Sequence, residues 1–60
     1  VPDKDEYLYI VEQLAKENDL NLDMDELHLL AERFALRRNG RSPRTARQFI
    51  SQQLAEQYSN

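Results

Sequence analysis

The sequence predicts an all-α fold, a small three-helix bundle, on three grounds. Apolar residues recur at i, i+3, i+4 and i+7 in three separate segments, which is the spacing of a helix with one buried face. Each segment is flanked by residues that favour helix ends. The 60 residues include one glycine, two prolines and no cysteine, which disfavours a sheet with tight turns and excludes disulfides. Helix packing must therefore supply nearly all the stability of so small a domain.

The first helix is expected to run from about Lys4 to Glu17. Asp3, with Glu6 three residues later, forms a start that resembles a capping box. Asn18 and Asp19 end the pattern, because these residue types favour caps and turns. The inward face combines Tyr7, Ile10, Val11 and Leu14, widened by Leu8 and Ala15.

The second helix is expected from about Met24 to Arg38. Asp23 and Glu26 repeat the capping arrangement at its start. Gly40, the only glycine, follows its end, and we assign it the left-handed conformation in which many helices terminate. The inward face is expected to contain Leu27, Leu30, Ala31 and Phe34.

The third helix is expected to begin at Ser42-Pro43 and to continue to about Gln57. Serine is a preferred N-cap, and proline is favoured at the first helical position. Three short helices with short connections predict a compact bundle. The inward face of this last helix is expected to contain Ala46, Phe49, Ile50 and Leu54.

Residues 1–60 therefore form a single helical domain. Because the chain opens on Val1-Pro2-Asp3 rather than on methionine, we expect it to be a domain excised from a larger protein. It has no apolar run near the ~20 residues that cross a bilayer, and no secretory signal, so we expect a cytoplasmic protein without a membrane partner.

The charges are distributed unevenly along the chain. Residues 1–32 hold two lysines and ten acids, a balance of −8, whereas residues 33–60 hold six arginines and one acid, a balance of +5. Such asymmetry indicates either an internal electrostatic match or an anionic partner.

Five arginines surround the expected turn between the second and third helices. Arg37 and Arg38 end the second helix, where cations suit the macrodipole by roughly 0.3–1 kcal/mol each. Arg44 has no such explanation, because the first turn of the third helix is the positive end of its dipole. Backbone N–H groups at a helix start bind anions, and the guanidinium fork suits phosphate. Arg44, flanked by Arg41 and Arg47, is therefore the leading candidate to bind a phosphate or a carboxylate.

The competing structural interpretation is that these arginines pair with acids of the first helix and its end. Glu12, Glu17 and Asp19 are the candidate partners. Exposed pairs of that kind contribute about 0–1 kcal/mol each. The charges alone leave both interpretations open.

Other positions have ordinary structural explanations. His28 is expected to be partly packed, without a catalytic role, because no base or nucleophile accompanies it. Tyr7 and Tyr9 fall on different faces of the first helix, so one should be buried and the other exposed. The acids at the helix starts suit the dipole and lack a calcium loop, so no metal site is expected. Leu20, Leu22, Met24 and Leu36 could form either an exposed apolar patch or ordinary core.

The run Gly40–Arg47 resembles the sensor-2 region in the helical lid of AAA+ ATPases, where a small cap residue and an arginine open the third lid helix. Ser42–Arg44 is similar to the Thr-Pro-Arg of the Holliday-junction branch-migration motor. The longer run Gly40–Phe49, with Asp5–Leu8, most resembles the C-terminal end of DUF815, a bacterial family of AAA+ ATPases of unknown function. The resemblance covers most of the chain.

The resemblance implies an AAA+ lid-like bundle that packs on an α/β nucleotide-binding domain of the same parent chain. By matching position, Arg44 would be the sensor-2 arginine that reaches the γ-phosphate of ATP, held with Mg²⁺ in the full-length parent. Arg47 and Arg41 are the second choices. The parent would be an ATPase able to form a homo-oligomer, whereas this part has no phosphate loop and is expected neither to hydrolyse ATP nor to bind it tightly. The chain departs from the pattern in two ways: many lids have four helices, and the family often has glycine where Pro43 stands.

Two other functions remain open from the sequence. The second and third helices could form a helix-turn-helix-like, nucleic-acid-binding domain, with arginines on phosphates or bases. The acidic chain argues against it, since nucleic-acid-binding domains are usually basic. A protein–protein module that uses the acidic first helix is the third alternative.

Overall fold

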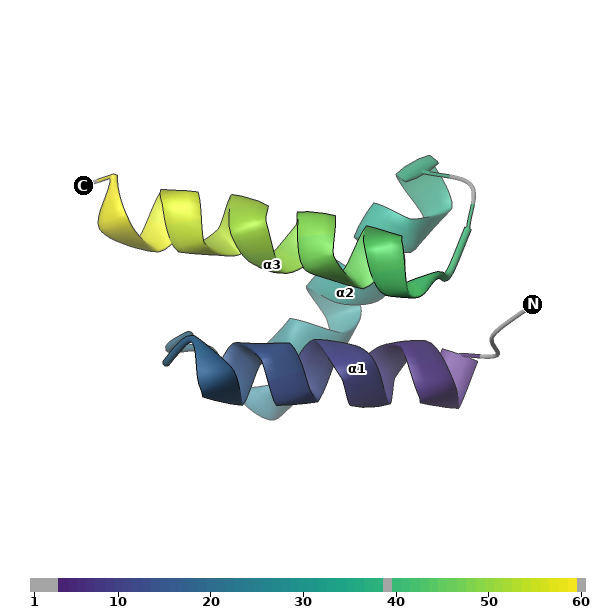
Figure 1. Cartoon of the computed structure of the whole chain (residues 1–60), viewed down its shortest axis with the longest axis horizontal. Helices are drawn as coiled ribbons and strands as arrows, with labels where there is room; N and C mark the ends of the chain where they lie inside the picture. The colour runs from purple at the N-terminus through teal and green to yellow at the C-terminus, as the bar shows by residue number, and fades with distance from the viewer. Residues whose placement is uncertain (1–3, 39, 60) are drawn as a thin grey trace.

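The structure, a computed structural model, describes residues 4–38 and 40–59. It contains α1 (Lys4–Glu17), α2 (Met24–Arg38) and α3 (Pro43–Tyr58). Helices α1 and α3 run in the same direction, one above the other, and α2 returns in the opposite direction behind them (Figure 1). The all-α, three-helix prediction is confirmed. The predicted bounds of the first two helices are those observed, and the third extends one residue beyond Gln57.

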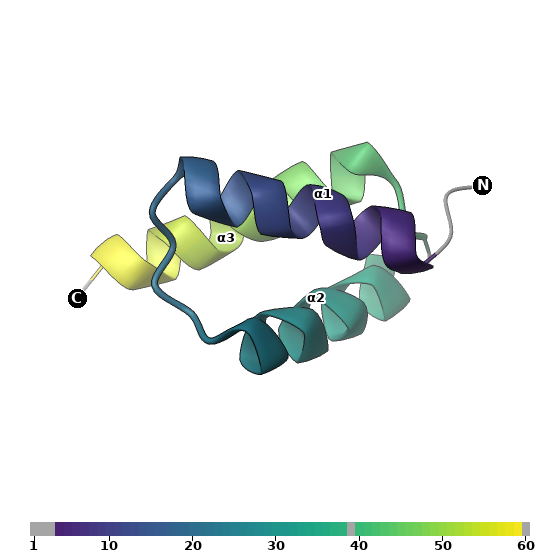
Figure 2. The ribbon, with the colours of Figure 1, turned by 90° about the horizontal axis from the view of Figure 1, so that it is seen from below.

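The three helices occupy the corners of a triangle. Seen from below, α2 lies to one side of the pair formed by α1 and α3 (Figure 2), and each helix contacts the other two. The bundle measures 34 × 19 × 18 Å. Because α2 is antiparallel to its neighbours, the end of α2 and the starts of α1 and α3 gather at one end of the molecule (Figure 1). This end is the one that carries most of the arginines.

The hydrophobic core takes one face of each helix. Tyr7, Val11 and Phe49 are the largest fully buried side chains. The Phe49 and Phe34 rings meet between α3 and α2 with centroids 5.6 Å apart and planes tilted by 58°, an arrangement that contributes about 0.5–1.5 kcal/mol beyond the buried area. Most of the predicted inward positions are confirmed. The buried set is Tyr7, Leu8, Val11, Ala15, Leu27, Ala31, Phe34, Ala35, Ala46, Phe49 and Ile50, with Ile10, Leu14, Leu20, Leu22, Leu30 and Leu54 partly buried against it.

Helix α1 ends at a residue in the left-handed conformation. Asp19 has a φ of 53°, its N–H donates to the Lys16 carbonyl at 3.3 Å, and the Leu20 N–H donates to the Ala15 carbonyl at 2.9 Å. These two bonds are those of the Schellman motif, in which the chain turns back toward the helix after the left-handed residue. Leu20 consequently packs against the core. The break predicted at Asn18 and Asp19 is confirmed.

The conformation assigned to Gly40 was wrong, because its φ is not positive. The Gly40 N–H donates to the Ala35 carbonyl at 3.0 Å. A bond that reaches back five residues is typical of the second residue beyond the end of a helix. Gly40 therefore stands one residue farther from α2 than we assigned it. A Cβ at this position would meet nothing within 4 Å, so packing does not require a glycine either.

The N-cap of α3 is Ser42, as predicted. Ser42 is extended, with φ −130° and ψ 163°, and α3 begins at the proline that follows. The Ser42 Oγ accepts a hydrogen bond from the Thr45 N–H at 3.1 Å. At the start of α2 the Leu27 N–H donates to the Asp23 carbonyl at 2.8 Å. Among the described residues, the side chains of Asp23 and Glu26 make none of the hydrogen bonds of the capping arrangement predicted there. The capping box proposed at Asp3 lies outside the described residues.

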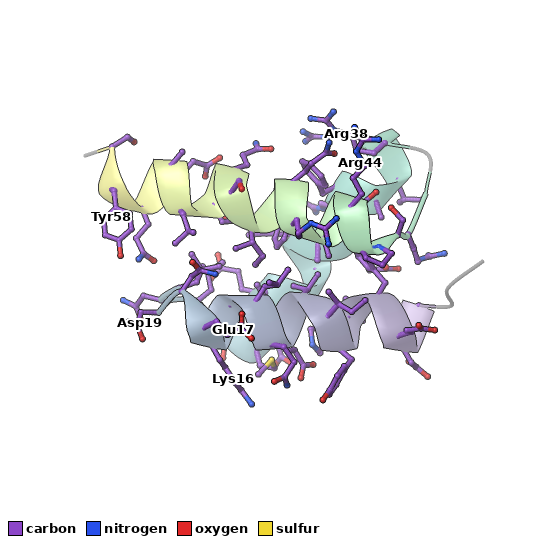
Figure 3. The ribbon with its side chains drawn as sticks, viewed as in Figure 1. Lys16, Glu17, Asp19, Arg38, Arg44 and Tyr58 are labelled. Carbon is purple, nitrogen blue, oxygen red and sulfur yellow. The ribbon has the colours of Figure 1, made fainter. Side chains whose placement is uncertain are left out.

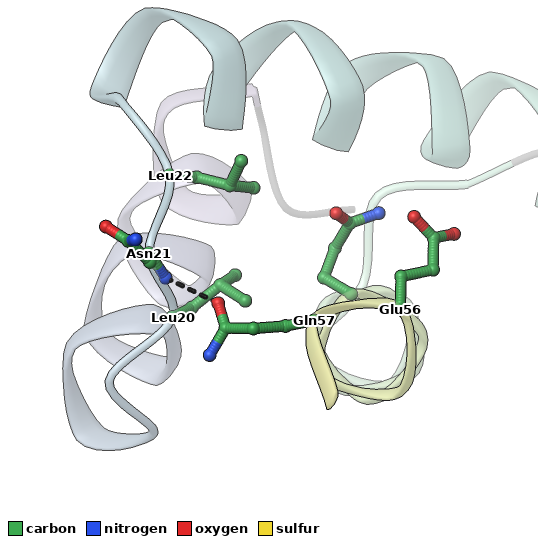
Figure 4. Close-up of a pocket in the computed structure, with 6 residues that line it drawn as sticks. Leu20, Asn21, Leu22, Glu56 and Gln57 are labelled. Carbon is green, nitrogen blue, oxygen red and sulfur yellow. Dashed lines mark hydrogen bonds between the residues drawn. The ribbon is translucent and has the colours of Figure 1, made fainter. Parts of the chain in front are cut away.

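The connection between α1 and α2 is tied to the last turns of α3. The Gln57 Oε1 accepts a bond from the Asn21 N–H at 2.8 Å, and the Gln57 Nε2 donates to the Asp19 carbonyl at 3.3 Å. Leu20 and Leu22 lie beside this contact and line a small pocket with Gln57 (Figure 4). Both leucines pack against the hydrophobic core and fill this end of the bundle.

The four residues considered for an apolar patch are separated in the structure. Leu20 and Leu22 are half-buried, whereas Met24 and Leu36 are 43% and 74% exposed and lie at opposite ends of α2. Within the described residues, no helix has both the length and the apolar character needed to cross a bilayer.

Candidate anion-binding site

A shallow depression lies beside the start of α3. Four of its lining residues, Arg44, Arg47, Gln48 and Ser51, come from α3, and Arg38 comes from the last position of α2. The α3 residues share one face because they lie three, four and seven positions after Arg44. All five side chains are exposed, and Figure 3 shows Arg38 and Arg44 at the same end of the molecule. We refer to these five residues as the arginine depression.

No carboxylate in the described parts of the chain forms an ion pair with Arg44 or Arg47. Glu17 and Asp19 lie at the C-terminal end of α1, toward the opposite end of the bundle (Figure 3). Glu12 is engaged elsewhere, since its Oε2 contacts the His28 Nε2 at 2.5 Å. The pairing with the acidic first helix, which the sequence left open, does not occur among these residues. The positive charge of the depression is therefore uncompensated.

Arg41 is turned away from the arginine depression. Its Nε and Nη2 donate to the Oε2 and Oε1 of Glu32 at 3.0 and 2.9 Å, a bidentate pair. The hydrogen bonds from Arg41 hold the pKa of Glu32 below its ordinary value, and the same bonds raise the pKa of Arg41. The sequence reasoning considered acids of the first helix and its end, whereas this partner lies on α2. Arg41 thus anchors the α2–α3 connection and leaves the site to Arg44 and Arg47.

The backbone at the start of α3 adds little to the site. Pro43 has no N–H, the Thr45 N–H donates to the Ser42 Oγ, and the Ala46 N–H donates to the Ser42 carbonyl at 3.0 Å. In the first turn of α3 this leaves the Arg44 N–H, for which the described residues supply no acceptor. An anion would therefore be held mainly by guanidinium groups, and not by the row of backbone donors that the sequence suggested.

Arg38 is positioned by the aromatic pair of the core. Its guanidinium carbon lies 4.9 Å from the centroid of the Phe34 ring, and that ring is buried against Phe49. At an exposed site such a cation–π contact contributes about 0.5–1 kcal/mol. The sequence reasoning gave Arg38 only a role at the helix end. The spacing of four residues between Phe34 and Arg38 was the available signal, since it places both on one face of α2.

The comparison with protein families covers this whole arrangement. The model of DUF815, described as a protein of unknown function, matches residues 1–57. The chain belongs to the DUF815 family. All five residues of the arginine depression lie within the region that DUF815 shares. Searches of curated proteins and of solved structures gave no match.

The chemistry that this DUF815 site can perform follows from its lining. Three guanidinium groups, one amide and one hydroxyl provide charge and hydrogen-bond donors, and the lining contains no carboxylate, histidine or cysteine. Such a site can bind an anion and neutralise its charge, but it offers no general base. The described residues bring together no group of three or more potential metal ligands.

Proposed function

We propose that this DUF815 chain is the helical lid of an AAA+ P-loop ATPase. In this proposal the bundle packs on an α/β nucleotide-binding domain of the same parent chain, which holds ATP with Mg²⁺. Arg44 is the sensor-2 arginine and contacts the γ-phosphate. The parent works in the cytoplasm and forms a homo-oligomer. What the parent acts on does not follow from the lid, because fold alone does not determine function.

One observation carries the proposal most directly. Arg44 lies at the start of α3, exposed and without a carboxylate partner in residues 4–38 and 40–59. A cation at the positive end of a helix dipole is mildly unfavourable, so an anionic ligand gives this position its physical purpose. The resemblance of Gly40–Arg47 to the sensor-2 region supports ATP as the source of that anion, because the sensor-2 arginine opens the same helix there.

The role of Arg44 in this proposal is electrostatic. Phosphoryl transfer is accelerated mainly by positioning the substrate and by stabilising charge on the phosphoryl oxygens. A guanidinium at the γ-phosphate supplies such charge and also links the nucleotide to the lid, so the loss of this phosphate changes the lid angle. Arg47, one turn along the same face, extends the contact toward the phosphates or toward a neighbouring subunit.

The test uses the full-length ATPase. Replacing Arg44 with alanine is expected to lower kcat by about tenfold or more, since loss of one donor to a transition-state oxyanion costs roughly 10²–10³-fold in a well-studied case. Arg33→Ala is the matched control, because Arg33 is an exposed arginine of α2 that does not line the depression. Unchanged turnover and unchanged nucleotide affinity in Arg44→Ala would show that the sensor role is wrong.

The alternative, nucleic-acid binding, is favoured by one specific observation. Arg44, Arg47 and Gln48 project from the N-terminal half of α3 on a single exposed face, as the base-contacting residues of a recognition helix do. Titration with duplex DNA distinguishes the two functions. Tight, salt-dependent binding that shifts the amide resonances of residues 40–48 would replace the lid by a nucleic-acid-binding domain.

A further inference from the structure

We propose that Arg38 is a second phosphate-binding residue, and that Arg38 and Arg44 form a clamp that holds one polyphosphate chain between the end of α2 and the start of α3. The identification of that chain as the phosphates of a nucleotide rests on the function proposed above. The clamp itself rests on the geometry and charge of the arginine depression.

The first argument is that the depression joins two helices. Arg38 ends α2 and Arg44 lies in the first turn of α3, yet both line one surface (Figure 3). The connection between these helices is fixed by the bidentate pair of Arg41 with Glu32. Because Arg38 and Arg44 line the same depression, one anion bound there can contact both guanidinium groups.

The second argument concerns the class of the anion. Arg38, Arg44 and Arg47 bring three positive charges to the depression. Gln48 and Ser51 add neutral donors along α3. One phosphate group carries about two negative charges at pH 7, whereas a chain of linked phosphates carries more charge and presents several oxygens in a row. The arrangement therefore suits a di- or triphosphate better than a monophosphate or a carboxylate.

The third argument is that a contact with the core favours one position of the Arg38 side chain before any ligand binds. Its guanidinium lies over the Phe34 ring, and that ring is held in the core by Phe49. A side chain that already favours its bound position loses less conformational entropy on binding, so more of its interaction energy appears as affinity. Ring stacking leaves the edge of the guanidinium plane available to donate to phosphate oxygens.

The neighbouring Arg37 provides a matched control. Arg37 and Arg38 are both exposed residues of the last turn of α2. They differ in direction, since Arg37 lines a separate depression that also contains Glu56. A general effect of net charge would make the two arginines equivalent for polyphosphate binding, whereas the clamp makes only Arg38 important.

The experiment is a titration of the isotope-labelled 60-residue chain with inorganic tripolyphosphate, followed by amide and guanidinium NMR shifts at low salt. We expect a dissociation constant of about 1 mM, with shifts at Arg38 and Arg44. Arg38→Ala is expected to weaken binding by about three- to tenfold, and Arg37→Ala by less than about twofold. Orthophosphate is expected to bind more weakly than tripolyphosphate.

Two results would overturn the clamp. One is an equal loss of affinity in Arg38→Ala and Arg37→Ala, and the other is a set of shifts that excludes Arg38. Arg38→Lys is the second variant. It keeps the charge but removes the planar fork, so the clamp predicts an affinity between those of the original chain and Arg38→Ala.

The clamp and the proposed function fail in distinguishable ways. If tripolyphosphate binds as expected but Arg44→Ala leaves the full-length ATPase unchanged, the clamp stands and its ligand is not the hydrolysed nucleotide. If Arg44→Ala lowers ATPase turnover while Arg38→Ala changes neither the KM for ATP nor tripolyphosphate binding, the lid function stands and the clamp is wrong.

Discussion

Replacing Tyr7 with phenylalanine removes a single oxygen atom from the centre of the bundle. Tyr7 is fully buried, and its hydroxyl donates to the Ala31 carbonyl at 2.8 Å, which fixes α1 against α2. A hydrogen bond of this kind contributes about 0.5–1.5 kcal/mol net. The Ala31 carbonyl lies within α2, so in Tyr7→Phe it still accepts the backbone hydrogen bond of that helix. We therefore expect the free energy of unfolding to fall by about 1 kcal/mol.

That loss is large for so small a domain. At roughly 0.05–0.15 kcal/mol per residue, the 60-residue chain is expected to be stable by only about 3–9 kcal/mol. A change of about 1 kcal/mol lowers the melting temperature of such a domain by roughly 4–8 °C. The effect is therefore measurable by thermal or denaturant unfolding at pH 7.

The same residue predicts a dependence on alkaline pH. Burial, with a smaller contribution from the Glu32 charge, raises the pKa of Tyr7 from 10.0 to about 12. A raised folded-state pKa means that this stability is complete below pH 10 and is lost as the pH rises toward about 12. The linkage relation gives a loss of about 1.4 kcal/mol by pH 11. The advantage of tyrosine over phenylalanine should therefore disappear near pH 11.

The assay is denaturant unfolding of the original chain, Tyr7→Phe and Tyr9→Phe at pH 8 and pH 11. Taking the difference from the original chain removes the contributions of groups common to both proteins. Tyr9 is 61% exposed, so Tyr9→Phe is expected to change little at either pH. The reasoning would be refuted if Tyr7→Phe and the original chain had the same free energy of unfolding at pH 8. It would also be refuted if the difference between them were equal at pH 8 and pH 11.

Three further substitutions test the elements that hold the site. Arg41 lowers the pKa of Glu32, so this carboxylate stabilises the fold at pH 7 and loses that contribution as the pH falls and it is protonated. Glu32→Gln should therefore reduce the fall in melting temperature between pH 7 and pH 3, and an unchanged fall would contradict this. Ser42→Ala should cost about 1 kcal/mol, read as a lower denaturation midpoint, whereas Ser51→Ala in the exposed middle of α3 should not. Phe49→Ala should cost about 3–5 kcal/mol and leave little folded protein by circular dichroism; a cooperative transition close to the original would show that the core is not as described.

The boundaries of the fold were predictable because they depend on local sequence. Ser42 is an N-cap whose function needs only the next few residues. Tyr7 and Tyr9 differ in burial as the helical period requires. Even the left-handed Asp19 lies at the predicted break, since aspartate tolerates that conformation better than most side chains.

The contacts of the site were less predictable because they depend on how the helices cross. Arg41, which follows α2, pairs with Glu32, nine residues earlier within that helix, and the spacing of residues along a helix does not predict this contact. Arg38 joins Arg44 because the end of α2 lies beside the start of α3. The sequence identified Arg44 as an unexplained cation, whereas the structure was needed to show which arginines accompany it and which one is engaged elsewhere.

The double hydrogen bond of Gln57 has a consequence for the order of folding. It joins backbone groups of residues 19 and 21 to a side chain 38 and 36 positions later, and α1 packs more extensively on α3 than on α2. The α1–α2 hairpin is therefore incomplete until the last helix is present, and we expect it to remain largely unstructured as a nascent chain. The bundle should then fold in one cooperative step, and only after residue 57 has left the ribosome.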